Sequence, residues 1–164
     1  MVKQDTPRIT WDENYKVQWQ DFKGTPQHNT TTVAVTASGI SFGFSSRKTE
    51  TELVSFTTNV KADFYPERSW YIKERVNDTV LNHERLHFDI TELYARKFRK
   101  RLQESTFTFN INDEMNKIHD AINKELGIMQ KKYDDETDHS QIIEKQIAWE
   151  KYIALELEKY AKYK

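Results

Sequence analysis

The chain has 164 residues, the size of one domain, and its 13% aromatic content is enough for one hydrophobic core. We therefore expect a single domain over residues 1–164. The net charge is −1 with both signs interspersed, so composition gives no sign of nucleic acid or an anionic membrane as a partner. No apolar run approaches the ~18 residues of a transmembrane helix. The lack of cysteine excludes disulfides and thiolate metal sites.

The first part of the chain, about residues 8–65, is typical of β-structure. The expected strand segments are residues 9–19, 30–45 and 52–64, which alternate or are rich in Thr, Val, Ile and Phe. Residues 21–26 contain Gly and Pro and predict a turn, and Ser38-Gly39 predicts a bulge or a turn. We expect an antiparallel sheet of three to four strands joined by hairpins. Residues 1–10 lack the apolar stretch of a secretory signal peptide.

The second part, about residues 77–164, is typical of long helices. Asn77 and Asp78 offer an N-cap for a helix over residues 79–103. A second helix is expected to begin at residues 110–113, and a third near residues 137–138. Together the two parts predict an α+β fold, with the antiparallel sheet followed by three long helices.

The clearest chemical signal is a pair of histidines four residues apart with a glutamate after the first. His83, Glu84 and His87 form the pattern His-Glu-x-x-His within the first predicted helix. The two histidines project from the helix only about 40° apart, so one Zn²⁺ ion can bind both. In such sites the zinc lowers the pKa of water, and the glutamate takes the proton and passes it to the leaving amine. The pattern predicts Zn²⁺ as cofactor and Glu84 as general base.

An alternative interpretation is that these three residues are the polar surface of a solvated helix. Neighbouring apolar residues argue against it, because they lie on or near the same side of the helix as the histidines. These residues are Leu81, Leu86, Ile90 and Tyr94. Buried polar groups need partners, and a metal ion would be one.

A catalytic zinc ion needs a third protein ligand, and the same helix offers two carboxylates. Glu92 and Asp89 both project away from the face of the histidines. We expect them to pair with Arg85 and Arg96 at i,i+4 spacing on the outer face of the helix, or to act in packing. The third ligand must then come from another element.

The candidates elsewhere in the chain are His28, His119, Asp134, Asp135, Glu136 and His139. Residues 133–139 are the stretch richest in ligand types, and we expect them at a helix start. We favour His139 as third ligand, with Glu136 or Asp135 as alternatives, although acidic residues at a helix start also serve as caps. Asp134 or Asp138 would orient a ligating imidazole. Tyr133 is predicted to stabilise an oxyanion with its hydroxyl, the alternative being that it closes the core.

Several segments together resemble a known family. They are residues 19–24, 36–40, 69–70, 81–90, 92–96 and 133–139, followed by Gln146 and Trp149. They resemble the bacterial family called domain of unknown function 922, whose members are described as predicted secreted zinc-dependent proteases. The chain departs from the family pattern at Ser140, where the pattern has Gly. The resemblance implies a zincin-like fold, zinc hydrolysis by the residues above, and a secreted or periplasmic location.

The leading hypothesis is thus a zinc metallopeptidase that binds its substrate as an added strand along a sheet edge, for example residues 40–44. Another hypothesis keeps the zinc and makes the protein an amidase for a cell-wall component. A further one is a non-catalytic binding module on a zincin scaffold, and intact Glu84 argues against it. The simplest is a helical interaction protein that binds no metal.

Overall fold

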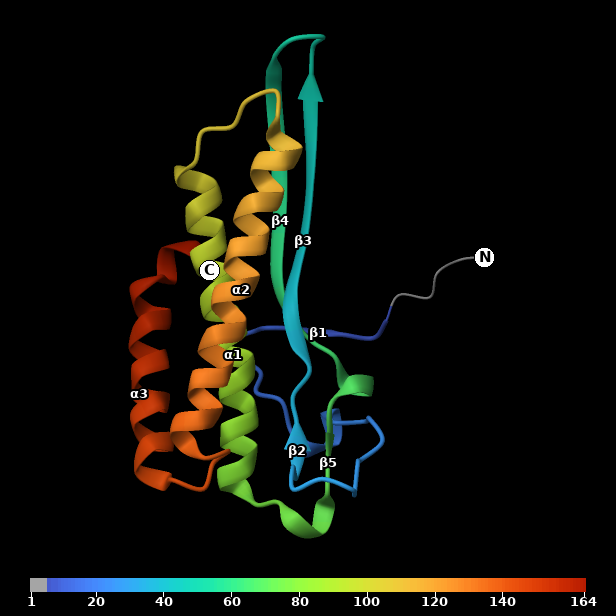
Figure 1. Cartoon of the computed structure of the whole chain (residues 1–164), viewed down its shortest axis with the longest axis vertical. Helices are drawn as coiled ribbons and strands as arrows, with labels where there is room; N and C mark the ends of the chain where they lie inside the picture. The colour runs from blue at the N-terminus through green and yellow to red at the C-terminus, as the bar shows by residue number, and fades with distance from the viewer. Residues whose placement is uncertain (1–5) are drawn as a thin grey trace.

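In residues 6–164, the part of the chain that the computed structural model describes, two β-sheets and three long helices make up the fold (Figure 1). The strands are β1 (Ile9–Thr10), β2 (Ala34–Val35), β3 (Ser38–Lys48), β4 (Leu53–Phe64) and β5 (Trp70–Tyr71). The helices are α1 (Asp78–Glu104), α2 (Ile111–Thr137) and α3 (Ile143–Lys159), with short 3-10 helices η1 (Trp19–Asp21), η2 (Pro66–Arg68), η3 (Lys73–Arg75) and η4 (Ala161–Tyr163). The predicted α+β fold, with an antiparallel sheet ahead of the helices, is confirmed.

The larger sheet is a long hairpin with one short added strand. β3 and β4 pair antiparallel, and β1 pairs with the end of β4, which gives the order β1-β4-β3. β2 and β5 form a separate antiparallel pair beside the beginning of α1 (Figure 1). Two expectations were wrong here. Only residues 9 and 10 of the first predicted segment are a strand, and Ser38-Gly39 is no turn, because it pairs with Asp63 and Phe64 inside the ladder.

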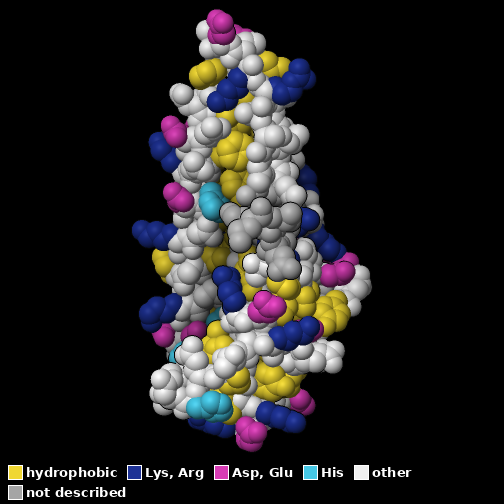
Figure 2. Space-filling model, turned by 90° about the vertical axis from the view of Figure 1, so that its right-hand side faces the viewer, with side chains coloured by type: hydrophobic (Ala, Val, Ile, Leu, Met, Phe, Trp, Pro, Cys, Tyr) yellow, Lys and Arg dark blue, Asp and Glu magenta, His cyan; other side chains and the backbone are white. Residues whose placement is uncertain are grey.

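α1 is the central helix, and its caps and packing follow from its sequence. The side chain of Asn77 accepts a hydrogen bond from the backbone N–H of Val80 at 3.0 Å, which is the predicted N-cap. The apolar side of α1 packs on the hairpin, where Phe98 meets Phe42 with ring centroids 4.8 Å apart. Figure 2 shows a line of hydrophobic side chains on the molecular face that carries this hairpin. None of the helices in residues 6–164 has the length and apolarity to cross a membrane.

The predicted outer face of α1 is covered. Glu92 pairs with Arg96 as expected, but the expectation that Asp89 pairs with an arginine was wrong. Glu92 is buried between the guanidinium groups of Arg96 and Arg99, at 3.1 and 3.2 Å. Asp89 accepts a hydrogen bond from the indole of Trp11 at 2.8 Å instead of pairing with an arginine. Residues near the N-terminus and α3 cover this side, since Arg96 also donates to the carbonyl oxygen of Leu157. The paired charges compensate each other in the interior.

The boundary between the second and third helices also differs from its prediction. α2 continues through Thr137, so residues 133–137 form its last turn and do not begin a helix. The acidic residues there suggested a helix start, but Lys131 and Lys132 pair with Asp135 and Glu136 at i,i+4 spacing. These pairs offset the cost of carboxylates near a helix C-terminus. The reassignment brings the end of α2 back beside the beginning of α1.

Candidate metal centre

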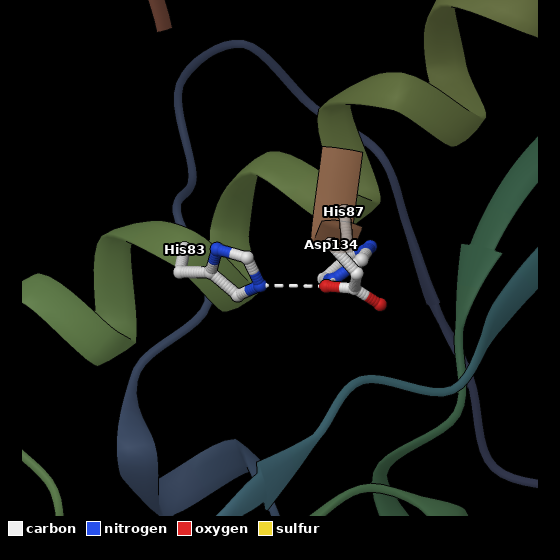
Figure 3. Close-up of side chains that lie close together, drawn as sticks. All are labelled: His83, His87 and Asp134. Atoms are coloured by element: carbon white, nitrogen blue, oxygen red, sulfur yellow. Dashed lines mark hydrogen bonds and ion pairs between the residues drawn. The ribbon is translucent and has the colours of Figure 1, made fainter. Parts of the chain in front are cut away.

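Three side chains from α1 and α2 meet at one point (Figure 3). The Nε2 atoms of His83 and His87 each lie 2.9 Å from the same carboxylate oxygen, Oδ1 of Asp134. Within residues 6–164 these three form the group of metal-ligating side chains close enough to share one ion, with all ligand atoms within 4.8 Å of one another. α1 and α2 run antiparallel (Figure 1), which places the last turn of α2 against the first turns of α1.

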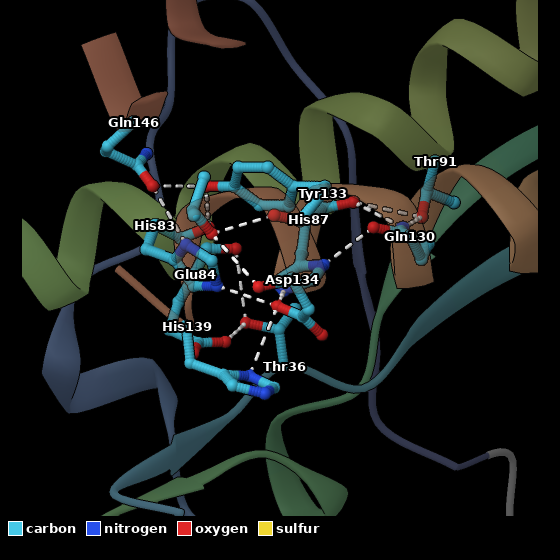
Figure 4. Close-up of polar contacts among 11 residues, drawn as sticks. Thr36, His83, Glu84, His87, Thr91, Gln130, Tyr133, Asp134, His139 and Gln146 are labelled. Carbon is cyan, nitrogen blue, oxygen red and sulfur yellow. Dashed lines mark hydrogen bonds and ion pairs between the residues drawn. The ribbon is translucent and has the colours of Figure 1, made fainter. Parts of the chain in front are cut away.

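Two glutamine side chains hold the other ring nitrogen of each histidine (Figure 4). Nδ1 of His83 lies 2.9 Å from Oε1 of Gln146, and Nδ1 of His87 lies 2.6 Å from Oε1 of Gln130. The amide nitrogen of Gln130 donates to the carbonyl oxygen of His87 and to Thr91, so its oxygen must face the ring. An amide oxygen only accepts hydrogen bonds, and each Nδ1 therefore carries the hydrogen. Each Nε2 is left with its lone pair facing Asp134.

This arrangement fits a divalent metal ion. When both rings are neutral, two imidazole lone pairs and one carboxylate oxygen converge here, and a cation or an added proton relieves the repulsion. Two nitrogens and one oxygen, with room for a further ligand, are the donor set of catalytic zinc sites. His83, His87 and Asp134 would hold the ion.

The electrostatics of the metal-free cluster point the same way. Burial lowers the pKa of His87, but the hydrogen bond to Asp134 and the charges of Glu84 and Asp134 outweigh it, so this pKa is raised. Burial raises the pKa of Asp134, but its hydrogen bonds to His83 and His87 outweigh that effect and hold this pKa well below its usual range. The pocket therefore favours positive charge between the rings and the carboxylate.

Glu84 lies beside the cluster, in the wall of a cleft that His83, His87 and Asp134 also line. Its side chain is buried, and its Oε2 atom accepts a hydrogen bond from the hydroxyl of Thr36 at 2.6 Å. Thr36 follows β2 directly, so the smaller sheet fixes one oxygen of this carboxylate. The other oxygen has no hydrogen bond to a described residue.

The cleft has a volume of about 990 Å³ and a largely polar wall. Its lining comes from β2 and its flanks (residues 31–36), from Arg75, Asn77 and Thr79 around the start of α1, and from the turn after α2 (residues 138–141). One edge of β2 pairs with no other strand of residues 6–164. The N–H of Ile72 donates to the carbonyl oxygen of Val33, so in an antiparallel ladder the backbone groups of Ala34 point away from β5.

Tyr133 occupies a place other than that expected of an oxyanion donor. It is fully buried, and its ring stacks on His83 with centroids 4.4 Å apart. Its hydroxyl lies 2.9 Å from Oε1 of Gln146 and 3.0 Å from the carbonyl oxygen of His83. The side chain does not line the cleft. Tyr133 thus supports the histidine from behind, as in the alternative that it closes the core.

The favoured third ligand, His139, lies at the cleft but outside the three-residue cluster. Its Nδ1 atom is 3.6 Å from Oδ1 of Asp134, and its side chain is 68% exposed. The alternatives point elsewhere: Glu136 accepts from the indole of Trp149, and Asp135 pairs with Lys131. His28 and His119 do not line the cleft. The side chain that meets the histidines is Asp134, which was among the candidates from the sequence but was not the favoured one, and which we had also considered as an orienting acceptor.

Sequence reasoning missed three supporting residues, Thr36, Gln130 and Gln146. One signal was available for Gln130, because it precedes Asp134 by four residues and so lies on the same face of α2. Thr36 and Gln146 belonged to the segments that carried the family resemblance, with no role attached. Nothing in the local sequence around Thr36 links it to Glu84, 48 residues away.

Comparison with known proteins gives one match. Neither the curated proteins nor the solved structures include a match to this chain. Residues 10–140, most of the chain, match the family described as bacterial protein of unknown function (DUF922). The match includes His83, Glu84, His87 and Asp134, and it agrees with the resemblance found in the sequence. The chain belongs to this DUF922 family.

Proposed function

We propose that this protein is a zinc-dependent metallohydrolase, first of all a peptidase, with His83, His87 and Asp134 as metal ligands and Glu84 as general base. The observation that carries the proposal is the convergence of two imidazole lone pairs on one carboxylate oxygen, at 2.9 Å each. A helix that bears this motif beside an antiparallel sheet also supports a zincin-like fold as part of the proposal.

A bound zinc ion supplies Lewis-acid polarisation of a carbonyl group and a lowered pKa of water. Glu84 takes a proton from the attacking water as the water oxygen bonds to the carbonyl carbon. It then gives that proton to the nitrogen as the carbon–nitrogen bond breaks, so the carboxylate is regenerated. Thr36 orients Glu84 for both transfers, because its hydroxyl binds Oε2 and leaves the other oxygen to handle the proton.

A peptide would bind as an added strand along the free edge of β2. The backbone groups of Ala34 that point away from β5 would pair with it, next to Glu84. This differs from the edge first expected, residues 40–44, which lie in β3. The cleft is lined by residues 31–36 and not by that segment.

A second candidate is a zinc amidase for a cell-wall component, which would use the same residues. The polar side chains of the cleft favour a polar substrate, and they include Thr31, Thr32, Thr36, Ser38, Asn77 and Thr79. A secreted or periplasmic location accompanies both candidates through the family resemblance. A binding module that performs no chemistry accounts less well for a buried Glu84 held by Thr36.

The test combines zinc content with hydrolysis of dye-quenched casein and of purified cell-wall peptides. We expect one zinc per chain in the wild-type protein, and Glu84→Gln should keep the zinc while activity falls by about 10²–10⁴-fold. Glu74→Gln, an exposed change in η3 outside the cleft, is the matched control. Failure to take up zinc, or full activity of Glu84→Gln, would refute the proposal, and the substrate cleaved decides between peptidase and amidase.

A further inference from the structure

The turn between α2 and α3 has an unfavourable backbone conformation. Asp138, His139 and Ser140 have φ values of 46°, 51° and 81°, all in the left-handed region. Residues other than Gly rarely adopt this region, and then as single residues. Asp tolerates it best, but no such preference helps Ser140, which is where the family pattern has Gly. Three in succession need support from the surrounding structure.

Hydrogen bonds from both sides supply that support. The N–H of His139 donates to the carbonyl oxygen of Asp134 at 3.0 Å, and the N–H of Ile142 donates to that of Thr137 at 2.9 Å. Ser140 is itself buried. The turn is therefore held in one conformation, which fixes the direction in which the Cα–Cβ bond of His139 points toward the cleft. Strain of this kind concentrates at functional sites.

The side chain so placed is the imidazole of His139, beside the candidate metal centre (Figure 4). Its Nδ1 atom lies 3.6 Å from Oδ1 of Asp134, the ion-pair contact drawn as a dashed line in Figure 4. This distance is too long for a hydrogen bond, and the ring makes none with any residue in the described part of the chain. A neutral imidazole always carries one N–H, so this ring has a donor available for a molecule in the cleft.

Two other candidate donors near the cluster, Tyr133 and Thr36, are already engaged. The hydroxyl of Tyr133 faces Gln146 and the carbonyl oxygen of His83 inside the core. The hydroxyl of Thr36 donates to Glu84. Hydrolysis of an amide nevertheless places negative charge on the carbonyl oxygen, and a preorganised donor lowers the energy of that state.

We infer that His139 is a further catalytic residue, whose ring N–H donates a hydrogen bond to the carbonyl oxygen of the bond under attack. This inference rests on the proposed function. As the water oxygen bonds to the carbon, the π electron pair of the carbonyl moves onto its oxygen, and the hydrogen bond stabilises the charge. The pair returns as the carbon–nitrogen bond breaks, and His139 neither gains nor loses a proton. The left-handed turn keeps the backbone of His139 beside the cleft in each cycle.

The experiment compares His139→Ala and His139→Gln with wild type and with His28→Ala, an exposed histidine outside the cleft. Three readouts are taken: zinc per chain, the absorption spectrum of the cobalt(II)-loaded protein, and kcat/KM for dye-quenched casein or, if casein is not cleaved, the cell-wall peptides. We expect His139→Ala to keep its metal and its spectrum while kcat/KM falls by about 10²–10³-fold. His139→Gln retains an N–H and should keep more of the activity than His139→Ala does. His28→Ala should have the activity of the wild-type protein.

Ser140→Gly tests the turn separately. Gly accepts the left-handed conformation without cost, so Tm should rise. Inorganic phosphate serves as an oxyanion probe: it should perturb the cobalt spectrum at lower concentration in wild type than in His139→Ala.

Each contrary result has a distinct meaning. Loss of metal or an altered cobalt spectrum in His139→Ala makes the ring a ligand, as the sequence first suggested, and overturns the inference. The inference is also overturned if His139→Ala keeps a kcat/KM and a phosphate response close to those of the wild-type protein. An unchanged Tm in Ser140→Gly overturns the account of the turn. A wild-type protein that binds zinc but cleaves nothing, or binds no zinc, overturns the proposed function and this inference with it.

Discussion

The Oδ1 atom of Asp134 lies 2.9 Å from the Nε2 atom of His83, although 51 residues separate the two along the chain. The contact has two chemical interpretations. If the imidazole carries a proton on Nε2, it donates to the carboxylate as an ordinary ion pair. With metal, the same atoms are ligands, because Gln146 holds the hydrogen of the ring on Nδ1. The two interpretations differ in how the protein responds to metal and to pH.

Replacing Asp134 tests the ligand set directly. Asp134→Asn keeps the shape of the side chain and removes the charge that neutralises the ion, so zinc affinity should fall by more than the ~10–100-fold typical of an outer-shell partner. Asp135→Asn is the control, since that carboxylate pairs with Lys131 on the surface. Zinc per chain and competition with a chelating dye measure the affinity. Equal zinc binding by Asp134→Asn and wild type would restore His139, Glu136 or Asp135 as third ligand.

The metal-free protein should lose stability as the pH rises through neutrality. The pKa of His87 is raised in the folded protein. Its contribution to the free energy of unfolding is therefore full when the pH is below the unfolded pKa of about 6.5, and it is lost as the pH rises through the folded pKa. The pKa of Asp134 is lowered in the folded protein. Its contribution to the free energy of unfolding is therefore present when the pH is above the unfolded pKa of about 3.9, and it is lost as the pH falls through the folded pKa. His87 and Asp134 together therefore stabilise the folded protein most between about pH 4 and 6.5.

Thermal unfolding in excess chelator, at about pH 6 and about pH 8, measures this effect. Tm should be lower at the higher pH, and Asp134→Asn should show a smaller difference. Zinc reverses the trend, because ligands must lose their protons to bind it, so the gain in Tm on adding zinc grows with pH. A metal-free protein whose Tm is the same at both values would contradict the assignment of the cluster.

Much of this arrangement could be predicted from local patterns. The helix that carries the motif was expected over residues 79–103, and α1 spans Asp78–Glu104 with Asn77 as its cap. Periodicity and capping suffice for this because they act within a few residues. The strand segment at residues 52–64 agrees with β4 for the same reason.

The third ligand and the turn could not be predicted in the same way. Which face of α2 meets α1 depends on where α2 ends, and its acidic last turn looked like a helix start. Ser140 gives no sign of a positive φ, since that signal is normally a Gly. The burial of Glu92 depends on segments far along the chain that cover α1. Such features follow from tertiary packing and have no local pattern.

Tyr133→Phe separates a supporting role from a catalytic one. The variant keeps the ring that stacks on His83 and removes the hydroxyl that faces Gln146. We expect a loss of about 1 kcal/mol in the free energy of unfolding, with zinc still bound and kcat nearly unchanged. Thermal unfolding and casein hydrolysis measure the two effects. A fall in kcat of about 10²-fold or more at unchanged Tm would instead make Tyr133 the oxyanion donor.

The paired glutamines should control metal affinity without touching the metal. Gln130 and Gln146 fix the tautomers of the two histidines, and a ligand ring without such a partner is free to turn or to carry its hydrogen on Nε2. Gln130→Ala and Gln146→Ala should each weaken zinc binding by about 10–100-fold. Gln141→Ala, a change at the cleft away from the histidines, should leave it unchanged.

A glutamate in place of either glutamine separates the effect on zinc affinity from the effect on stability. Gln130→Glu supplies a stronger acceptor for Nδ1 of His87 and makes that ring more basic, so zinc should bind more tightly than in Gln130→Ala. The carboxylate cannot replace the donated bonds to the carbonyl oxygen of His87 and to Thr91, so the free energy of unfolding should fall by about 1–3 kcal/mol. Tighter zinc binding with a lower Tm in the metal-free protein is the expected pair of results. Alanine and glutamate variants that bind zinc as wild type does would show that the histidines do not depend on these amides.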